Sequence, residues 1–185
     1  MKEDNLFKLV GTLVIISILS AIVLTFTYEL SNPLIQKNKD TKLKNALKEV
    51  MPEAEKFEEV KNLPSGVKGE REGIKRVFKG YDKEGKVRGI VILSDAVGFN
   101  DFIHLLFGLD VKGRITQVKI LEHLETPGLG ERITKSDFLN QFRGKSPSLE
   151  GVDTITGATI SSSAVVNRIK KDSLIIANLM KTKKI

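Results

Sequence analysis

The chain has 185 residues and a formal net charge of +7, from 30 Lys and Arg against 23 Asp and Glu. It contains no Cys, which excludes disulfides, thiolate nucleophiles and iron–sulfur or zinc–thiolate ligation by its own residues. Only two His are present, His104 and His123, so a multi-histidine metal site within the chain is excluded too. This length predicts one ordinary domain with an appendage.

The N-terminal segment predicts a membrane anchor. Leu9 to Tyr28 is an uncharged run of about 20 residues, long enough to cross the roughly 30 Å hydrocarbon core as a helix. A cleaved signal peptide would have a shorter apolar region and a small-residue cleavage site, and Thr25 to Glu29 offers none. We therefore expect an uncleaved single-pass anchor in the lipid bilayer.

The cations beside this anchor bear on its orientation. Lys2 and Lys8 precede it, and a larger group follows it, namely Lys37, Lys39, Lys42, Lys44 and Lys48. Taken literally, this charge bias places the C-terminal part inside the cell, although long folded domains translocate largely regardless of charge. Scattered cations and few aromatics exclude a nucleic-acid partner and favour anionic headgroups or acidic subunits.

The segment after the anchor predicts a helical stalk. Ser31 or Asn32 can cap a helix with Pro33 at its first position, and apolar residues then recur at helical spacing until Pro52. We expect an N-terminus and anchor over residues 1–30, with the N-terminus cytoplasmic, a stalk over 31–55 and a folded domain over 56–185.

The folded domain begins with hairpin patterns. GIKRVFKGYD and VRGIVILSD flank the turn KEGK, and FIHLLFGLD and RITQVKILEHLE flank VKG with Gly113 in the turn. A short helix is expected near Ser136 to Phe142 and a long one from about Ser161 to Met180. The predicted fold class is α+β: a single N-terminal transmembrane helix, then an antiparallel sheet domain with packed helices.

The stretch DTITGATISSS, from Asp153 to Ser163, precedes the long helix and has two interpretations. Ser and Thr are preferred helix caps and Gly157 supplies a flexible turn, so capping alone explains it. A helix start approached by small residues is equally a natural place for a phosphate. Gly157 and Ala158 would leave the Thr159 hydroxyl accessible to an outside enzyme.

This stretch closely resembles the flavinylation motif of the FMN-binding domain family, with Asp153, then Thr156, Gly157, Ala158 and Thr159, and Ser161 two positions on. Thr156 stands where many members have Ser. The resemblance implies that FMN is bound covalently, through a phosphoester to Thr159, by a separate flavin transferase. It also implies cofactor contacts from Thr156, Gly157, Ala158 and Ser161.

A second motif, ETPGLG from Glu125 to Gly130, resembles the other hallmark of the same family. By itself it predicts a Pro-Gly turn at the end of a strand, and a glycine-rich loop also lets backbone approach a ring or phosphate closely. The resemblance implies that Glu125, Thr126, Leu129 and Gly130 contact the cofactor. The segment GFNDFIHLLFGLD departs from the family, with Asn100 and Asp101 where a Gly-Tyr-x-Gly pattern is usual.

Members of the family that carry one N-terminal transmembrane helix belong to ion-translocating complexes. The resemblance favours an electron-transfer subunit of the Rnf type, in a complex that moves electrons between ferredoxin and NAD and transports Na⁺ or H⁺. Its partners are the other membrane and redox subunits, and its domain is extracytoplasmic, contrary to the charge count. The alternatives are the corresponding subunit of a sodium-translocating NADH:quinone reductase, or a tethered module without redox function.

Other candidate catalysts have simpler explanations. Glu122, Glu125 and Glu131 could act as acids or bases, but carboxylates at a strand end are usually solvated or paired. His123 alternates with Leu121 and is expected to be a half-exposed strand residue. We therefore predict no independent catalytic site and no metal site.

Overall fold

The computed structural model describes residues 3–61, 63–64, 67, 69 and 72–182. Its chain divides into two compact units, Met1–Lys44 and Asn45–Ile185. The first consists of helix, and the second holds the sheet, the remaining helices and the core.

The predicted anchor lies in a single long helix, α1, over Glu3–Val50. Within the part of the chain that is described, one helix is long and apolar enough to cross a membrane, and it is this one. Its large apolar side chains between Leu9 and Leu30 are exposed. The hydroxyls of Thr12, Ser17 and Thr25 donate to backbone carbonyls four residues earlier, which satisfies them inside the helix.

The separate helix start predicted at Ser31 to Pro33 is wrong, because Pro33 lies inside α1 and the helix continues past it. An interior proline removes one helical hydrogen bond and its ring crowds the carbonyl four residues earlier, but the helix can continue past it when the residues on both sides favour helix. The residues that follow, up to Val50, extend the same helix.

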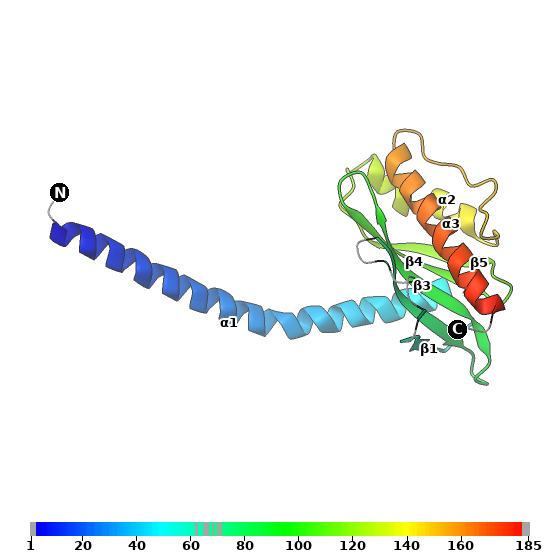
Figure 1. Ribbon diagram of the computed structural model, residues 1–185, viewed down its shortest axis with the longest axis horizontal. Coiled ribbons are helices and arrows are strands. Elements are labelled where there is room, and N and C mark those ends of the chain that lie inside the picture. Colours follow the sequence, from blue (N-terminus) through cyan, green and yellow to red (C-terminus); the bar gives the residue numbers. More distant parts are fainter. Residues whose placement is uncertain (1–2, 62, 65–66, 68, 70–71, 183–185) are drawn as a thin grey trace. The chain divides into compact units, whose positions relative to one another are not determined.

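The predicted fold class is confirmed in the second unit, which is built on a five-stranded antiparallel sheet. The strands are β1 (Lys56–Glu59), β2 (Gly73–Tyr81), β3 (Val87–Val97), β4 (Phe102–Asp110) and β5 (Ile115–Glu122). Their order in the sheet is their order in the chain, so each strand pairs with the next one (Figure 1). Both predicted hairpins are present.

The two predicted hairpin turns have the same hydrogen-bond pattern and the same glycine conformation. In DKEGK the Oδ1 atom of Asp82 accepts the N–H groups of Glu84 and Lys86, and Gly85 adopts a positive φ of 79°. In DVKGR the Oδ1 atom of Asp110 accepts the N–H groups at the equivalent two positions, and Gly113 has φ 77°. Aspartate supplies the acceptor and glycine the left-handed residue that such turns need.

Helices cover one face of the sheet. Gly130–Thr134 forms the 3-10 helix η1, Ser136–Leu139 forms α2, Asn140–Phe142 forms η2 and Thr159–Lys181 forms α3. Figure 1 shows α2 and α3 on the same face. The core lies between them and the sheet, and from α3 it includes Val165, Ile169 and Ile176, as the helical spacing predicts.

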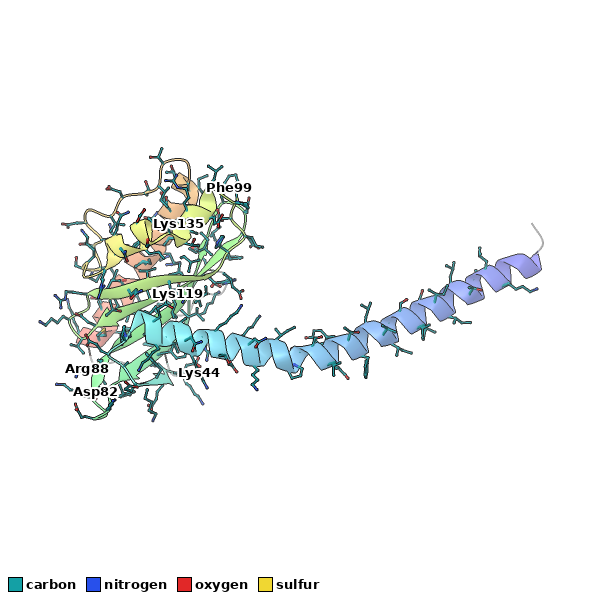
Figure 2. All side chains as sticks on the ribbon, turned by 180° about the vertical axis from the view of Figure 1, so that it is seen from behind. Lys44, Asp82, Arg88, Phe99, Lys119 and Lys135 are labelled. Carbon is teal, nitrogen blue, oxygen red and sulfur yellow. The ribbon has the colours of Figure 1, made fainter. Side chains whose placement is uncertain are left out.

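The opposite face of the sheet packs against the end of α1 and the residues after it. Val50, Met51 and Ala54 are buried there. A Cβ atom on Gly80 would lie 2.7 Å from the Met51 sulfur, and one on Gly89 would lie 2.6 Å from Met51 Cε, so these strand glycines make room for the methionine. The Lys119 ammonium, labelled in Figure 2, pairs with Glu49 beside them.

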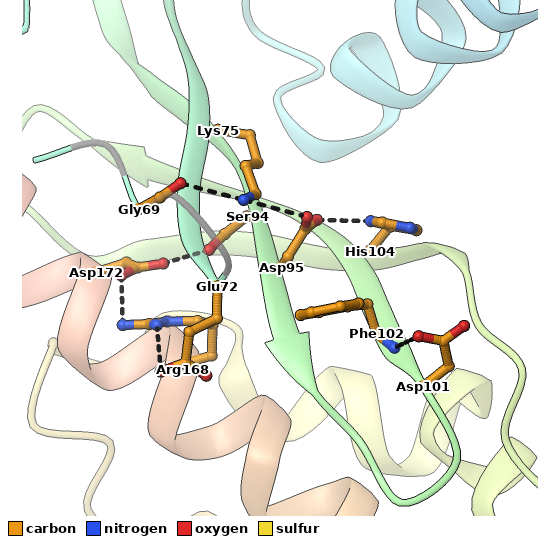
Figure 3. Close-up of polar contacts among 10 residues, drawn as sticks. All are labelled: Gly69, Glu72, Lys75, Ser94, Asp95, Asp101, Phe102, His104, Arg168 and Asp172. Atoms are coloured by element: carbon orange, nitrogen blue, oxygen red, sulfur yellow. Dashed lines mark hydrogen bonds and ion pairs between the residues drawn. The ribbon is translucent and has the colours of Figure 1, made fainter.

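A buried polar cluster joins α3 to the sheet (Figure 3). The Ser94 hydroxyl on β3 donates to Asp172 over 2.5 Å, and Arg168 pairs with the same carboxylate over 2.9 Å. Asp172 is almost fully buried, and its burial raises the pKa of that carboxyl, while Ser94 and Arg168 act in the opposite direction. The cluster therefore helps to set which side of α3 packs against the sheet.

Candidate functional site

The ETPGLG segment forms a tight turn after the sheet. β5 ends at Glu122, earlier than the strand pattern predicts, and His123 to Thr126 are irregular. The Leu129 N–H donates to the Thr126 carbonyl over 3.2 Å, and Gly128 has φ 74°, which a type II turn with Pro127 before it requires. The segment then enters η1 at Gly130.

The start of α3 lacks the hydroxyl cap that the sequence suggests. The N-cap residue is Ala158, which has no side chain able to cap. The Ser162 hydroxyl is buried inside the helix, where it donates to the Ala158 carbonyl over 2.8 Å and accepts the Ile155 N–H over 3.0 Å. The capping interpretation is therefore wrong, because this hydroxyl is committed to the turn before the helix.

Three backbone donors are left at this helix start. Among hydrogen bonds between described residues, none engages the backbone N–H of Thr159, Ile160 or Ser161. The Thr159 side chain is exposed. Unpaired N–H groups at the positive end of a helix form a favourable environment for an anion. The structure thus places an accessible hydroxyl and three free donors at one point.

Glu125 connects this helix start to two other segments. Its side chain is only 4 % exposed. One carboxylate oxygen accepts the N–H groups of Phe99 over 2.9 Å and Asn100 over 3.3 Å, in the loop between β3 and β4, and the other accepts the Ser161 hydroxyl. A single buried carboxylate therefore holds together two loops and the start of α3, which are far apart in the sequence.

Two glycines make room for that carboxylate. A Cβ atom on Gly98 would lie 2.1 Å from Glu125 Oε1, and one on Gly130 would lie 2.8 Å from Glu125 Oε2. Neither position can carry a side chain unless the carboxylate moves. The Asn100 side chain donates to the Leu124 carbonyl over 3.0 Å and so stabilises the contact between the two loops. Asn100 lies at the position where the sequence departs from the family pattern.

These segments line a cavity of about 360 Å³ that is open to solvent on one side, and its volume is within the range of small-molecule sites. Eight of the nine predicted cofactor contacts line it, namely Glu125, Thr126, Leu129, Gly130, Gly157, Ala158, Thr159 and Ser161. The ninth, Thr156, does not line the cavity. Its carbonyl accepts a hydrogen bond from Arg132 over 2.9 Å, which ties the TGAT turn to η1.

The sequence interpretation missed two residues that line the cavity, Phe99 and Ile160. With Leu129 they form an apolar rim, since their side chains are 63 %, 58 % and 52 % exposed respectively. Phe99 lies in the loop after β3 (Figure 2). An exposed apolar cluster around a cavity marks a binding site more strongly than single exposed residues do. Its signal in the sequence was one aromatic residue in a loop, which is too common to single out.

Of the candidate acids and bases, Glu125 lines this cavity, and Glu122, Glu131 and His123 do not. His104, Glu122 and His123 line a neighbouring hollow of about 370 Å³. His104 Nδ1 is 2.6 Å from Asp95, and His123 Nδ1 accepts the Glu125 N–H over 3.2 Å, so each histidine is engaged locally. Glu131 accepts the Gly128 N–H over 3.1 Å. Over the described residues, no group of three or more His, Asp or Glu could hold a metal ion.

Comparison with known proteins decides the family. Residues 98–172 match the model of the FMN-binding domain, a range that contains both motifs. The chain is 36 % identical over 175 residues to the G subunit of the ion-translocating oxidoreductase complex of Methanosarcina acetivorans, covering 90 % of this chain and 92 % of the relative. The chain belongs to this G-subunit family. Its C-terminal part is an FMN-binding domain.

Two further similarities agree with this assignment. The chain is 24 % identical to the G subunit of the proton-translocating ferredoxin:NAD(+) oxidoreductase complex of Clostridium ljungdahlii, covering 91 % of this chain and 90 % of the relative. The crystal structure of Shewanella oneidensis NqrC has the same fold, with a TM-score of 0.53 and 18 % identity over 73 % of this chain and 88 % of that one. At that identity the likeness concerns the fold alone.

Proposed function

We propose that this protein is the electron-transfer subunit of an Rnf-type ion-translocating ferredoxin:NAD⁺ oxidoreductase, and that it carries FMN in a phosphoester to Thr159. One observation carries the proposal: the two family motifs, about thirty residues apart in the sequence, line the same cavity, and Thr159 is exposed at its edge. The Methanosarcina and Clostridium relatives support the assignment to the complex.

The helix start is suited to hold the phosphate of FMN. The free N–H groups of Thr159, Ile160 and Ser161 would donate to its oxygens, and the helix dipole would stabilise its charge. Attachment requires an activated donor, so a flavin transferase would use a flavin phosphoanhydride. The anhydride P–O bond breaks, the Thr159 Oγ1–P bond forms, and the hydroxyl proton is lost as the other phosphate leaves.

The apolar rim is suited to a flat ring. Phe99, Leu129 and Ile160 expose apolar surface beside Thr159 and would shield one part of the ring from water. The FMN group would supply one- and two-electron transfer, and the chain would supply its position, surroundings and solvent exclusion. A covalent tether would keep the carrier at high local concentration near its partner subunits. The domain itself then needs no catalytic acid or base.

We further propose that α1 anchors the chain in the cell membrane and that the domain is extracytoplasmic, next to the other membrane and redox subunits. The exposed cations after the apolar run, such as Lys37 and Lys44, favour the opposite side by the loop-charge bias. A folded domain of this size lies outside the range in which that bias is decisive. The coupling ion would be Na⁺ or H⁺.

The alternatives are less well supported. NqrC shares the fold at 18 % identity, whereas the Methanosarcina relative shares 36 % identity over nearly the whole chain. A tethered module without redox function would need the TGAT turn to serve only as a cap, and Ala158 at the N-cap position removes that explanation.

Covalent flavin tests the proposal directly. The full chain is produced with and without a flavin transferase, and each preparation is run on a denaturing gel under ultraviolet light. We expect fluorescence that survives denaturation, requires the transferase and is lost in Thr159→Ala. Thr154→Ala, which removes another exposed hydroxyl from the same turn, should keep it. An intact mass without FMN in the presence of the transferase would refute the attachment.

The side of the membrane has its own test. Because the chain has no Cys, a single Lys135→Cys substitution provides a unique label site on the exposed surface of the domain. An impermeant maleimide should label this variant in intact cells. Labelling that occurs only after the cells are lysed would place the domain inside.

A further inference from the structure

The Glu125 carboxylate has three hydrogen-bond donors around it and no counter-ion among the residues that the structure describes. Two are backbone N–H groups, of Phe99 and Asn100, which can only donate, and the third is the Ser161 hydroxyl. An ionised carboxylate is an acceptor only, and this surrounding satisfies both of its oxygens. None of the ion pairs between described residues includes Glu125. Its negative charge is therefore held by hydrogen bonds rather than by a cation.

This charge lies at the wall of the cavity. Glu125 is one of the residues that line it, and at 4 % exposure its carboxylate is little screened by water or salt. The backbone at Gly98 and Gly130 lies close against the carboxylate, since a Cβ at either position would overlap it, and three hydrogen bonds hold the carboxylate in place. A group bound in the cavity has this fixed negative charge as a neighbour.

We infer that Glu125 lowers the reduction potential of the flavin, an inference that rests on the proposed function because it requires FMN in this cavity. Each electron that enters the cavity adds negative charge unless a proton follows it. A buried negative neighbour makes that added charge unfavourable, so it favours the oxidised form and makes the reduced form a stronger donor. Glu125 thus acts on the cofactor through its charge, in addition to holding the three segments together.

The experiment compares potentials of full-length, flavin-loaded variants by spectroscopic redox titration. Glu125→Gln is nearly isosteric, keeps a carbonyl oxygen for the N–H groups of Phe99 and Asn100, and removes the charge. At the wild-type midpoint potential we expect its reduced-to-oxidised ratio to rise on the order of tenfold, as for loss of a poorly screened charge nearby. Glu125→Asp, which keeps the charge, should stay closer to the wild type.

Two controls separate charge from geometry. Ser161→Ala removes one hydrogen bond to the carboxylate but leaves its charge, so its potential should not rise as that of Glu125→Gln does. Glu122→Gln removes an exposed carboxylate that does not line the cavity, and water should screen its effect. An unchanged or lower potential in Glu125→Gln would overturn the inference. So would an equal rise in Ser161→Ala, because geometry would then be the cause.

Failure of the inference and failure of the proposed function give different results. Wild-type protein without gel-stable fluorescence would refute the attachment and the inference with it, whereas loaded protein without the potential shift refutes the inference alone. If Glu125→Gln does not load, Thr126→Lys supplies the test, since Thr126 lines the same cavity. A cation at that position must raise the potential of the loaded protein, and an unchanged value overturns the role of charge.

Discussion

The guanidinium Nη1 of Arg132 donates to the carbonyl oxygen of Thr156 over 2.9 Å. This contact joins η1, directly after the ETPGLG loop, to the turn that carries Thr159. It is the one described hydrogen bond of Thr156, the predicted contact that does not line the cavity. Arg132 therefore positions the acceptor turn from outside the cavity.

Replacement of Arg132 by Ala should slow flavin attachment while the domain stays folded. The bond is exposed, so we expect a loss of about 0.5–1 kcal/mol in the free energy of unfolding. Attachment depends on the position of the turn, and the rate at which gel-stable fluorescence appears should fall more clearly than stability does. Arg143→Ala removes another exposed arginine and should label at the wild-type rate. Equal rates in all three proteins would contradict a positioning role.

Replacement of Thr159 by Ala should abolish attachment with little effect on stability. Thr159 is exposed and Ala158, not Thr159, is the N-cap residue, so no cap is lost. We expect the free energy of unfolding to stay within about 0.5 kcal/mol of the wild type. Denaturant titration of unloaded protein in detergent, followed by circular dichroism, measures it. Global unfolding of this variant would show that Thr159 is structural.

Replacement of Ser162 by Ala should destabilise the domain. Its buried hydroxyl accepts the Ile155 N–H, and alanine would leave that donor unpaired at a cost of about 1–3 kcal/mol. Ser163→Ala, one residue along and only half-buried, is the matched control and should change stability little. The same titration compares them. Similar stability of both variants would mean that water replaces the Ser162 hydroxyl.

The buried Asp172 carboxyl predicts a pH dependence of stability. Burial raises its pKa above the ordinary value of 3.8, so the folded state binds the proton more tightly than the unfolded state does. Stability from this group is therefore full at low pH and is lost as pH rises from about 4 through the folded pKa.

Asp172→Asn removes that titration and retains an oxygen for Arg168. The free energy of unfolding of the wild type minus that of the Asn variant should fall as pH rises above about 4 and then level off. Taking the difference cancels the other titrating groups that the two proteins share. A difference that rises with pH would mean that Ser94 and Arg168 outweigh burial and lower the pKa.

The elements predicted well from the sequence are those specified locally. The hairpin turns DKEGK and DVKGR carry their own acceptor and their own glycine, and the apolar face of α3 repeats at helical spacing. Both motifs pointed to the cavity because the family resemblance supplied their pairing. Continuity of α1 through Pro33 was missed, since a proline after Ser and Asn is also a good helix start.

The rest depends on contacts between distant segments. Glu125 is buried because it packs against Gly98, 27 positions before it, and Ser161, 36 positions after it. No pattern within a single segment reveals contacts between residues so far apart. The missing cap has a similar cause. A row of hydroxyls before a helix predicts capping, but packing of α3 on the sheet buries Ser161 and Ser162 and gives their hydroxyls other partners.

The order of the strands has a consequence for the timing of maturation. Each strand pairs with its predecessor, so the sheet can assemble as the chain emerges, whereas the acceptor turn leads into α3, the last element described, and the contact of Ser161 with Glu125 depends on that helix. Until α3 has been synthesised and has docked, the hydroxyl of Ser161 cannot reach Glu125 and the cavity does not exist. A transferase that recognises the folded turn would therefore modify only chains that have already folded, and bound flavin would indicate that the domain of that chain has folded.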